Sequence, residues 1–384
     1  MEKIGWGLIG GGRGSQIGPV HRLGAMMDGK YSFLAGALDV DKKESEKFGV
    51  ELGLSPSRAY GDWSEMLKSE RNREDKLGLV TVATPNDTHF EICKAFLESG
   101  FNVLCEKPMT MTLEEAQEIF IMAQKSNKIC AVNYGYSGFP LVREMKSMIA
   151  SGNLGKIRLV KAEFAHGHHA DALGAENPRV RWRYDPKQAG VSAVMADCGI
   201  HALHMACFVT GQDVLEVSAD FVSTVPSRTL EDDAMINFRM TAGTVGRLWS
   251  SAIAIGRQHG LTIQVFGEHG GLRWSQEQPN QLFYMPLGQR LQIIERGENS
   301  LSSTAVQASR VTIGHSEGMS EAFANIYLDL ANEIAAINSG ISFSGDYLFP
   351  DAEDGLRSVA AIHAAAVSSS NLGEWTPAVP EILK

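Results

Sequence analysis

The sequence predicts an α/β protein in which a doubly wound parallel sheet is followed by an α+β domain with a large, mainly antiparallel open sheet. From residue 4 to 132, short apolar runs suited to buried strands alternate with helical patterns, which is typical of a parallel sheet with crossover helices. From residue 157 to 294, strand patterns follow one another with few helices between them. We therefore expect a first domain at residues 1–133 and a second at 134–384.

The composition is that of an ordinary globular chain. Its 384 residues are 44% hydrophobic and 21% charged, a length sufficient for two domains. The 35 basic and 45 acidic side chains give a net charge of −10, which disfavours binding to nucleic acid or to acidic membranes. Small molecules are the expected partners.

The cysteines and the hydropathy favour a cytoplasmic location. The five cysteines are an odd number without a C-x-x-C pair, so we expect reduced, buried thiols. They are Cys93, Cys105, Cys130, Cys198 and Cys207. The sequence enters its first strand within three residues, which predicts no signal peptide, and no apolar run approaches the length of a membrane span.

A glycine-rich turn follows the first apolar run, Ile4 to Ile9, and leads into a helical segment. Glycines let a backbone approach a pyrophosphate, and a helix N-terminus offers unpaired N–H groups, so this order predicts a Rossmann unit that binds a dinucleotide. Ser15 takes the third glycine position of the usual G-x-G-x-x-G pattern. A purely structural β–α turn is the alternative. The candidate cofactor residues here are Gly10, Gly12, Arg13, Gly14, Ser15, Gln16 and Ile17.

Asp39 ends the second apolar run, Phe33 to Leu38. A carboxylate in this position accepts hydrogen bonds from the ribose hydroxyls and repels a 2′-phosphate, which favours NAD over NADP. Asp39 lies 29 positions after Gly10 (39 − 10), further than the usual spacing of about 20. It could instead begin the turn into the helix that starts near Lys42. Arg13 keeps NADP open as a second possibility.

The rest of the first domain continues the alternation. Strands are expected at Leu79–Ala83, Asn102–Cys105 and Ile129–Val132, and helices at Lys42–Leu52, Trp63–Ser69, His89–Ser99 and Leu113–Ser126. Two polar motifs follow strands, where ligands bind in an open α/β sheet. They are Thr84-Pro85-Asn86 and Glu106-Lys107-Pro108. A lysine at this edge is costly to bury unless it is used, although a surface lysine before a proline turn is the simpler interpretation.

These motifs resemble the Gfo/Idh/MocA oxidoreductase family. The resemblance rests on the glycine-rich start, on Thr84-Pro85-Asn86 with His89, and on Glu106-Lys107-Pro108. It implies an NAD-dependent enzyme in which these residues line the cofactor site and Lys107 also contacts the substrate. It further implies a homo-oligomer, a dimer or tetramer, formed through the sheet of the second domain.

In the second domain, a helix is expected at Pro140–Ser151 and late helices at Ser320–Asn338 and Asp351–Ser369, the last packing back on the first domain. Strands are expected at Ile157–Phe164, Val214–Val222, Asp232–Met240, Thr244–Ala254, Leu261–Phe266, Gln281–Met285 and Leu291–Ile294. The passage Ala165 to Ala196 is polar and rich in histidine. His166 and His168 are expected to line the substrate pocket, and a solvated loop is the alternative.

Asp197 and His201 are the candidate catalytic pair of the second domain. If Asp197 begins a helix, His201 lies one turn later on the same face. Histidine has a pKa suited to accept an alcohol proton, and a carboxylate can orient it. The alternative is a helix N-cap and a core histidine. The family pattern D-x-G-x-H-x-x-D matches through His201, but His204 stands where the family usually has Asp.

Further residues are weaker candidates. Trp182-Arg183 resembles a family segment over the nicotinamide, and Tyr136, His166, His168 and His315 are candidates for substrate contact. A metal reading would use Asp197, His201 and His204 with His166, His168 and His169. The spacing is wider than zinc sites show and no cysteine assists, so no metal is expected.

The combined prediction is an NAD-dependent dehydrogenase of a secondary alcohol in a cyclitol, sugar or glycoside, similar to inositol or pyranose dehydrogenases. Lys107, Asp197 and His201 are the predicted catalytic residues. Two alternatives stay open. One is NAD-assisted redox cleavage of a glycoside, and the other is a non-catalytic NAD-binding sensor, which would not need these three residues together.

Overall fold

The computed structural model describes residues 3–171, 178–340 and 348–384, and the chain divides into two compact units. The first unit comprises Met1–Thr110, Glu114–Gly138 and Met319–Gly355, and the second comprises Met111–Leu113, Phe139–Gly318 and Leu356–Lys384. The expected boundary after residue 133 lies near the crossing at Gly138. The sequence did not indicate that Met319–Gly355 returns to the first unit. The last helix is divided between the units at Leu356, and its packing on the first domain stays a prediction.

The first unit contains a five-stranded sheet in the order β2-β1-β3-β4-β5, and every pair in it is parallel. The strands are β1 (Ile4–Gly10), β2 (Tyr31–Ala37), β3 (Leu79–Ala83), β4 (Val103–Cys105) and β5 (Cys130–Val132). This confirms the predicted doubly wound sheet. Because β1 has β2 on one side and β3 on the other, the order reverses beside β1, and ligands bind at such a switch point.

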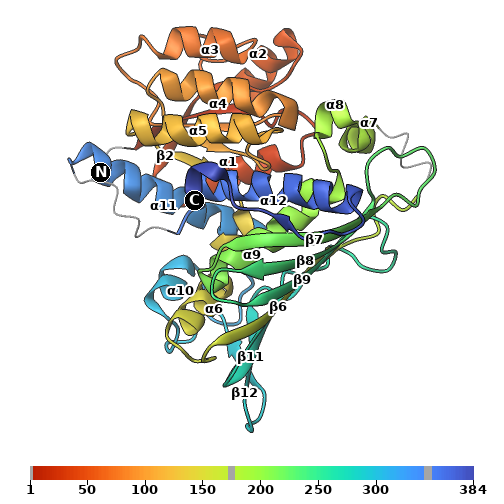
Figure 1. The fold of residues 1–384 in the computed structure, drawn as a ribbon. Coiled ribbons are helices and arrows are strands. Elements are labelled where there is room, and N and C mark those ends of the chain that lie inside the picture. Colours follow the sequence, from red (N-terminus) through yellow and green to blue (C-terminus); the bar gives the residue numbers. More distant parts are fainter. Residues whose placement is uncertain (1–2, 172–177, 341–347) are drawn as a thin grey trace. The chain divides into compact units, whose positions relative to one another are not determined.

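Helices follow the strands of the first unit (Figure 1). They are α1 (Ile17–Met27), α2 (Lys42–Glu51), α3 (Trp63–Glu70), α4 (His89–Glu98), α5 (Leu113–Ser126) and α11 (Met319–Asn338), with short 3₁₀ turns at Asn86–Thr88 and Gly135–Gly138. Asp41 and Asp62 begin α2 and α3 by accepting the backbone N–H groups of Glu44 and Glu65.

Helix α11 completes the core of the first unit, although it comes late in the chain. Its Tyr327 and Leu330 are buried in one cluster with Trp6 and Leu8 of β1. Helices α1 and α11 pack closely, since a Cβ added to Gly24 would lie 2.9 Å from the Cβ of Phe323.

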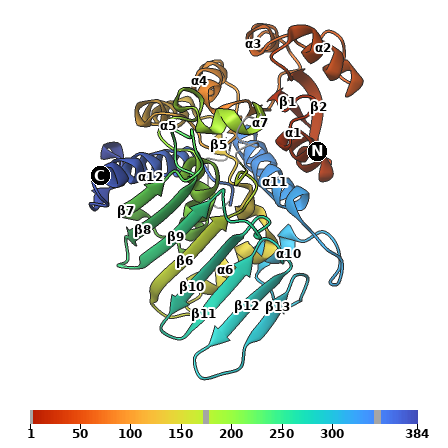
Figure 2. The same cartoon turned by 90° about the vertical axis from the view of Figure 1, so that its right-hand side faces the viewer.

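The second unit contains a nine-stranded sheet in the order β13-β12-β11-β10-β6-β9-β8-β7-β14 (Figure 2). Its strands are β6 (Ile157–Ala165), β7 (Val214–Val222), β8 (Asp233–Met240), β9 (Val245–Ser251), β10 (Leu261–Gly267), β11 (Gly270–Ser275), β12 (Gln281–Pro286), β13 (Gln292–Glu295) and β14 (Thr376–Pro377). All pairs are antiparallel except β6 with β9, which confirms the mainly antiparallel sheet. Strands β11 and β14 were not predicted.

The helices of the second unit are mostly short. They are α6 (Pro140–Ala150), α7 (Pro178–Arg181), α8 (Pro186–Ala189), α9 (Ile200–Thr210), α10 (Ser303–Ala308) and most of α12 (Ala352–Ser370), with 3₁₀ turns at Trp182–Tyr184 and Glu381–Leu383 and a π turn at Met195–Gly199. Helices α6 and α9 pack on each other, and α9 packs on β6. Among the described helices, none combines the length and apolarity that a membrane crossing requires.

Candidate active site

The glycine-rich turn lies against the carboxyl ends of β2 and β3. Gly10 has a φ of +77°, and a Cβ added to it would lie 2.4 Å from the carbonyl oxygen of Ala83. A Cβ added to Gly12 would lie 2.3 Å from the carbonyl oxygen of Leu38. A side chain at either position would clash with these carbonyl oxygens, so only glycine lets the turn pack here. This turn, the glycine cradle, is of the kind that binds a dinucleotide.

The packing role of the third glycine falls to Gly18, which the sequence prediction missed. A Cβ on Gly18 would lie 2.0 Å from the carbonyl oxygen of Gly11. Ser15, predicted to take this role, instead accepts a 3.1 Å hydrogen bond from the Gly18 N–H at its Oγ. Gln16 and Ile17 stand at the start of α1, where N–H groups can meet a phosphate.

Asp39 lies beside the glycine-rich turn, with its Oδ2 3.3 Å from the position of a Cβ on Gly12. Asp39 Oδ1 accepts a 3.0 Å hydrogen bond from the Asp41 backbone N–H, so Asp39 also begins the turn into α2, while Asp41 is the N-cap of that helix. Arg13, the candidate for binding a 2′-phosphate, donates hydrogen bonds to Glu44 at 3.0 Å and Glu51 at 2.5 Å. These carboxylates neutralise its charge, and this arrangement favours NAD.

His89 supports two turns at this edge. The ring is fully buried, its Nδ1 lies 2.8 Å from the carbonyl oxygen of Pro108, and its Nε2 lies 2.9 Å from that of Thr84. Burial lowers the pKa of His89, although both carbonyls favour the protonated ring. Because both ring nitrogens are used within the protein, the ring ties the Thr84-Pro85-Asn86 turn to the Glu106-Lys107-Pro108 turn. The contact of His89 with the cofactor stays a prediction, and the two hydrogen bonds add a supporting role.

Glu106 is held by two side chains. Its Oε1 lies 3.0 Å from His21 Nε2 and accepts a 2.5 Å hydrogen bond from Asn133 Nδ2. Burial alone would raise the pKa of Glu106, but the hydrogen bonds and charges of His21, with the Asn133 hydrogen bond and the Lys107 charge, keep it below its ordinary value. Lys107 is the only residue of 101–110 that is not buried. Tyr136, the other substrate candidate of the first unit, is 7% exposed.

In the second unit, Asp197 lies in the π turn and His201 in the first turn of α9. The two are therefore four positions apart on one continuous helical stretch, and Asp197 is not the N-cap. Its Oδ2 accepts a 2.8 Å hydrogen bond from Arg183 Nε. The sequence named Arg183 as a cofactor or substrate ligand and did not indicate this ion pair.

His166 and His169 line a small pocket together with Asp197. The rings of His166 and His168 stack with centroids 4.6 Å apart, and His166 Nε2 lies 3.4 Å from Cys198 Sγ. The His201 ring lies 6.0 Å from that of Phe164. Burial, with the charges of neighbouring groups, lowers the pKa of His166 to about 4, which keeps the ring neutral at pH 7.

The segment that leads into the π turn is held by a buried carboxyl group, that of Glu231, which the prediction missed. Glu231 accepts hydrogen bonds from Ser192 Oγ at 2.5 Å, from Ala193 N at 3.1 Å and from Met195 N at 3.0 Å. Burial raises the pKa of Glu231. No sequence pattern marks a carboxylate that caps a helix more than thirty positions earlier in the chain.

The other second-unit candidates lie in different surroundings. Trp182 stacks under the Arg183 guanidinium, 4.5 Å from ring centroid to Cζ. His204 is 5% exposed, and burial lowers its pKa to about 3, so the residue that replaces the family's Asp is a neutral buried ring. Residues 172–177 of the passage Ala165 to Ala196 lie outside the described residues.

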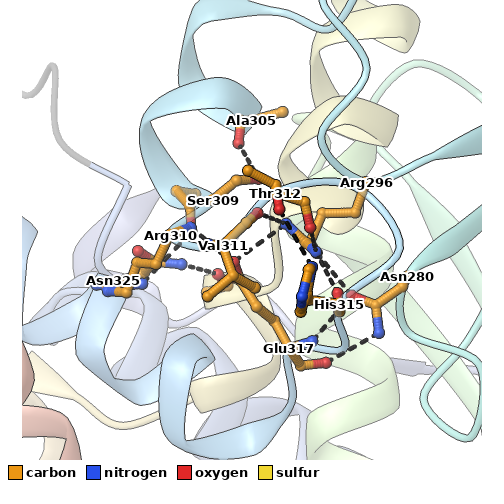
Figure 3. Close-up of polar contacts among 12 residues, drawn as sticks. Asn280, Arg296, Ala305, Ser309, Arg310, Val311, Thr312, His315, Glu317 and Asn325 are labelled. Atoms are coloured by element: carbon orange, nitrogen blue, oxygen red, sulfur yellow. Dashed lines mark hydrogen bonds and ion pairs between the residues drawn. The ribbon is translucent and has the colours of Figure 1, made fainter.

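His315 stands on a loop fixed by a buried ion pair (Figure 3). Arg296 lies 3.1 Å from Glu317 and donates to the carbonyl oxygens of Val311, Thr312 and His315. The His315 side chain itself is exposed. Within residues 3–171, 178–340 and 348–384, no group of three or more His, Cys, Asp or Glu is arranged to hold a metal ion.

A parallel sheet whose first turn only glycine can occupy is characteristic of dinucleotide-binding enzymes. Residues 4–134 match the oxidoreductase family with an NAD-binding Rossmann fold, and residues 142–273 match the GFO/IDH/MocA C-terminal domain. The chain is thus an NAD-binding oxidoreductase. It belongs to the Gfo/Idh/MocA family, which confirms the resemblance.

Similar proteins cover almost the whole chain. An inositol dehydrogenase homolog from Azotobacter vinelandii, complexed with NADH and myo-inositol, has a TM-score of 0.92 and 38% identity over 98% of each chain. The oxidoreductase YfiI of Bacillus subtilis is 37% identical over 97% of this chain and 96% of its own length. The levoglucosan dehydrogenase of Pseudarthrobacter phenanthrenivorans is 26% identical over 73% of this chain and 76% of its own length.

Proposed function

We propose that this chain oxidises a secondary alcohol of a cyclitol, sugar or glycoside with NAD, and that the reverse reduction uses the same residues. One observation carries the proposal: Lys107 is the one residue of 101–110 that is not buried. It follows β4 at the carboxyl ends of the parallel strands, where the glycine cradle also lies. Relatives that act on levoglucosan or are complexed with myo-inositol support this substrate class.

Each residue of the proposed mechanism has one task. Bound NAD supplies the hydride acceptor. His201 accepts the hydroxyl proton; its Nδ1 is buried, so we assign the acceptor to Nε2. Lys107 donates a hydrogen bond to the developing alkoxide, and Asp197 orients His201. The cradle of Gly10 and Gly12, with Asp39 at the ribose, would hold the cofactor.

A screen of cyclitols, sugars and glycosides, followed by reduced-nicotinamide absorbance, tests the proposal. Lys107→Ala and His201→Ala are each expected to lower kcat by about 100-fold or more. The first removes the hydrogen-bond donor to the alkoxide, and the second removes the group that accepts the hydroxyl proton. Lys94→Ala and His269→Ala, both outside the site, serve as matched controls. Wild-type turnover in either site variant would contradict the assignment. Release of an aglycone without accumulation of NADH would favour redox-assisted glycoside cleavage instead.

We further propose that the chain forms a homo-oligomer through the nine-stranded sheet. Strand pairing places Met235, Phe266, Met285 and Ile293 on one face, and each is at least 36% exposed. Apolar exposure of this kind is typical of interfaces. Light scattering on a Phe266→Asp variant is expected to show smaller particles than the wild type, and an unchanged mass would contradict this interface.

A further inference from the structure

Lys107 is flanked by two anchored residues. The Glu106 backbone N–H donates to Val82 O at 2.9 Å, and Glu106 as a residue is 9% exposed. On the other side, the carbonyl oxygen of Pro108 faces a ring nitrogen of His89. The Lys107 backbone N–H itself donates to Glu106 Oε2 at 3.3 Å. The main chain of the lysine is therefore held through its neighbours.

His21 holds the first neighbour. Its ring is fully buried and bridges Glu106 Oε1 at 3.0 Å and the Tyr327 hydroxyl at 2.9 Å. Because an ionised carboxylate can only accept, the proton in the Glu106 contact lies on His21 Nε2. The Tyr327 hydroxyl lies 2.9 Å from Thr81 Oγ1, so His21 is fixed in turn by the core of the unit.

His89 holds the second neighbour, Pro108, through the other ring nitrogen. Here it is Nδ1 that faces the tripeptide, 2.8 Å from Pro108 O, while Nε2 faces Thr84 O at 2.9 Å. Both carbonyl oxygens only accept, and a neutral ring carries one N–H, so it donates to one of them. The proposal requires this proton on Nδ1, toward Pro108.

We propose that His21 and His89 are positioning residues for Lys107, which hold Glu106 and Pro108 through hydrogen bonds from Nε2 and from Nδ1, respectively. The inference rests on the proposed function of Lys107. An ammonium on a flexible four-carbon stem must reach one oxygen, and errors of about 1 Å in such placement can cost roughly 100-fold in rate. Neither imidazole needs to touch substrate or cofactor for this effect.

The opposite orientation of the two rings gives a test with amide substitutions. In a superposed side chain, the Gln amide nitrogen replaces Nε2 and the Asn amide nitrogen replaces Nδ1. His21→Gln therefore keeps the donor to Glu106, whereas His21→Asn loses it. At the other position the order is reversed, since His89→Asn keeps the donor to Pro108 and His89→Gln loses it. The exposed His269, changed to Gln and to Asn, is the control.

The expected result is a crossed pattern in kcat. His21→Gln and His89→Asn stay within about 3-fold of wild type, whereas His21→Asn and His89→Gln fall by about 10-fold or more. The dissociation constant for NAD, measured by calorimetry, stays within about 3-fold in all four, because the glycine cradle is untouched. Equal effects of both amides at each position, or loss of NAD affinity in step with kcat, would overturn the proposal.

A second measurement uses the wild-type protein and needs no variant to fold. Long-range ¹H–¹⁵N spectra of the histidine rings are expected to show a proton on Nε2 of His21 and on Nδ1 of His89. Absence of either proton would refute the arrangement. If the wild type oxidises none of the alcohols screened, the proposed function fails, while this ring assignment still stands or falls by itself.

Discussion

Arg183 and Asp197 form an ion pair, in which Arg183 Nε donates to Asp197 Oδ2 at 2.8 Å. Both side chains are about one-quarter exposed, at 26% and 28%, so the pair borders solvent and can meet a substrate. It holds one carboxylate oxygen of Asp197 in a set direction, as the proposed role of Asp197 in orienting His201 requires.

Arg183→Ala is therefore expected to lower kcat by about 10-fold with an unchanged dissociation constant for NAD, because the Asp197 carboxylate loses its direction. Arg183→Lys should recover part of the rate, since lysine keeps the charge but not the planar fork. Steady-state kinetics with calorimetry measure both quantities. Weaker NAD binding with an unchanged kcat would instead assign Arg183 to the cofactor.

Gly18→Ala is expected to weaken NAD binding by about 10-fold or more, because its methyl group would lie 2.0 Å from Gly11 O and displace the turn. Calorimetric titration with NAD measures this change. Gly271→Ala, where the nearest atom would be 3.4 Å away, is the matched control and should bind NAD normally. Equal NAD affinity in the two variants would refute the proposal that the glycine-rich turn binds NAD.

Cofactor choice should respond to the partners of Arg13. Replacing Glu44 and Glu51 by Gln, together with Asp39→Asn, releases the Arg13 guanidinium and removes the charge that repels a 2′-phosphate. The ratio of kcat/KM for NADP to that for NAD is expected to rise by about 10-fold. Glu46→Gln on the same helix is the control. An unchanged ratio would show that Arg13 and Asp39 do not face the adenosine ribose.

The protein should lose stability as pH falls below about 6.5. The folded-state pKa of His204, at about 3, lies below the unfolded value of 6.5, so the unfolded chain binds the proton first and is favoured. This stability is complete above pH 6.5 and is lost as pH falls toward 3; at pH 5 the loss from His204 is about 2 kcal/mol. Urea unfolding of His204→Leu at pH 7 and pH 5 should show a smaller difference than wild type. An equal difference would mean that His204 is not buried as a neutral ring.

The loop of His315 should depend on its ion pair. Arg296→Met removes the cation of a buried pair and leaves the Glu317 carboxylate with the backbone N–H groups of Arg310 and Val311 but without Arg296. The expected cost is about 3 to 5 kcal/mol in unfolding free energy. The double variant with Glu317→Leu should recover part of that loss, and urea titrations measure it. Additive losses would show that the two side chains act independently.

The sequence predicted the elements whose signals are local. Buried apolar runs marked the parallel strands, and the helix at Leu113–Ser126 was predicted with the bounds that the structure has. Strand β11 was missed because Gly270-Gly271 resembles a turn and its pairing with β10 and β12 is a tertiary property. The sequence did not indicate the return of α11 to the first unit, because that packing is encoded by no local pattern.

For the candidate site, the sequence found side chains that carry recognisable chemistry. It did not find those that act through others, namely His21, Glu231 and the pairing of Arg183 with Asp197. Such residues are separated by tens or hundreds of positions from their partners, as His21 is from Tyr327. Their signal lies in contacts that only the folded chain makes.

The late position of α11 has a consequence for biosynthesis. Tyr327 and Leu330 belong to the same buried cluster as Trp6, so the ribosome must synthesise most of the chain before the first strand can bury its inner face completely. Until then the nascent nucleotide-binding half exposes apolar surface that chaperones recognise. A fragment that stops before residue 319 would remain in that unfinished state.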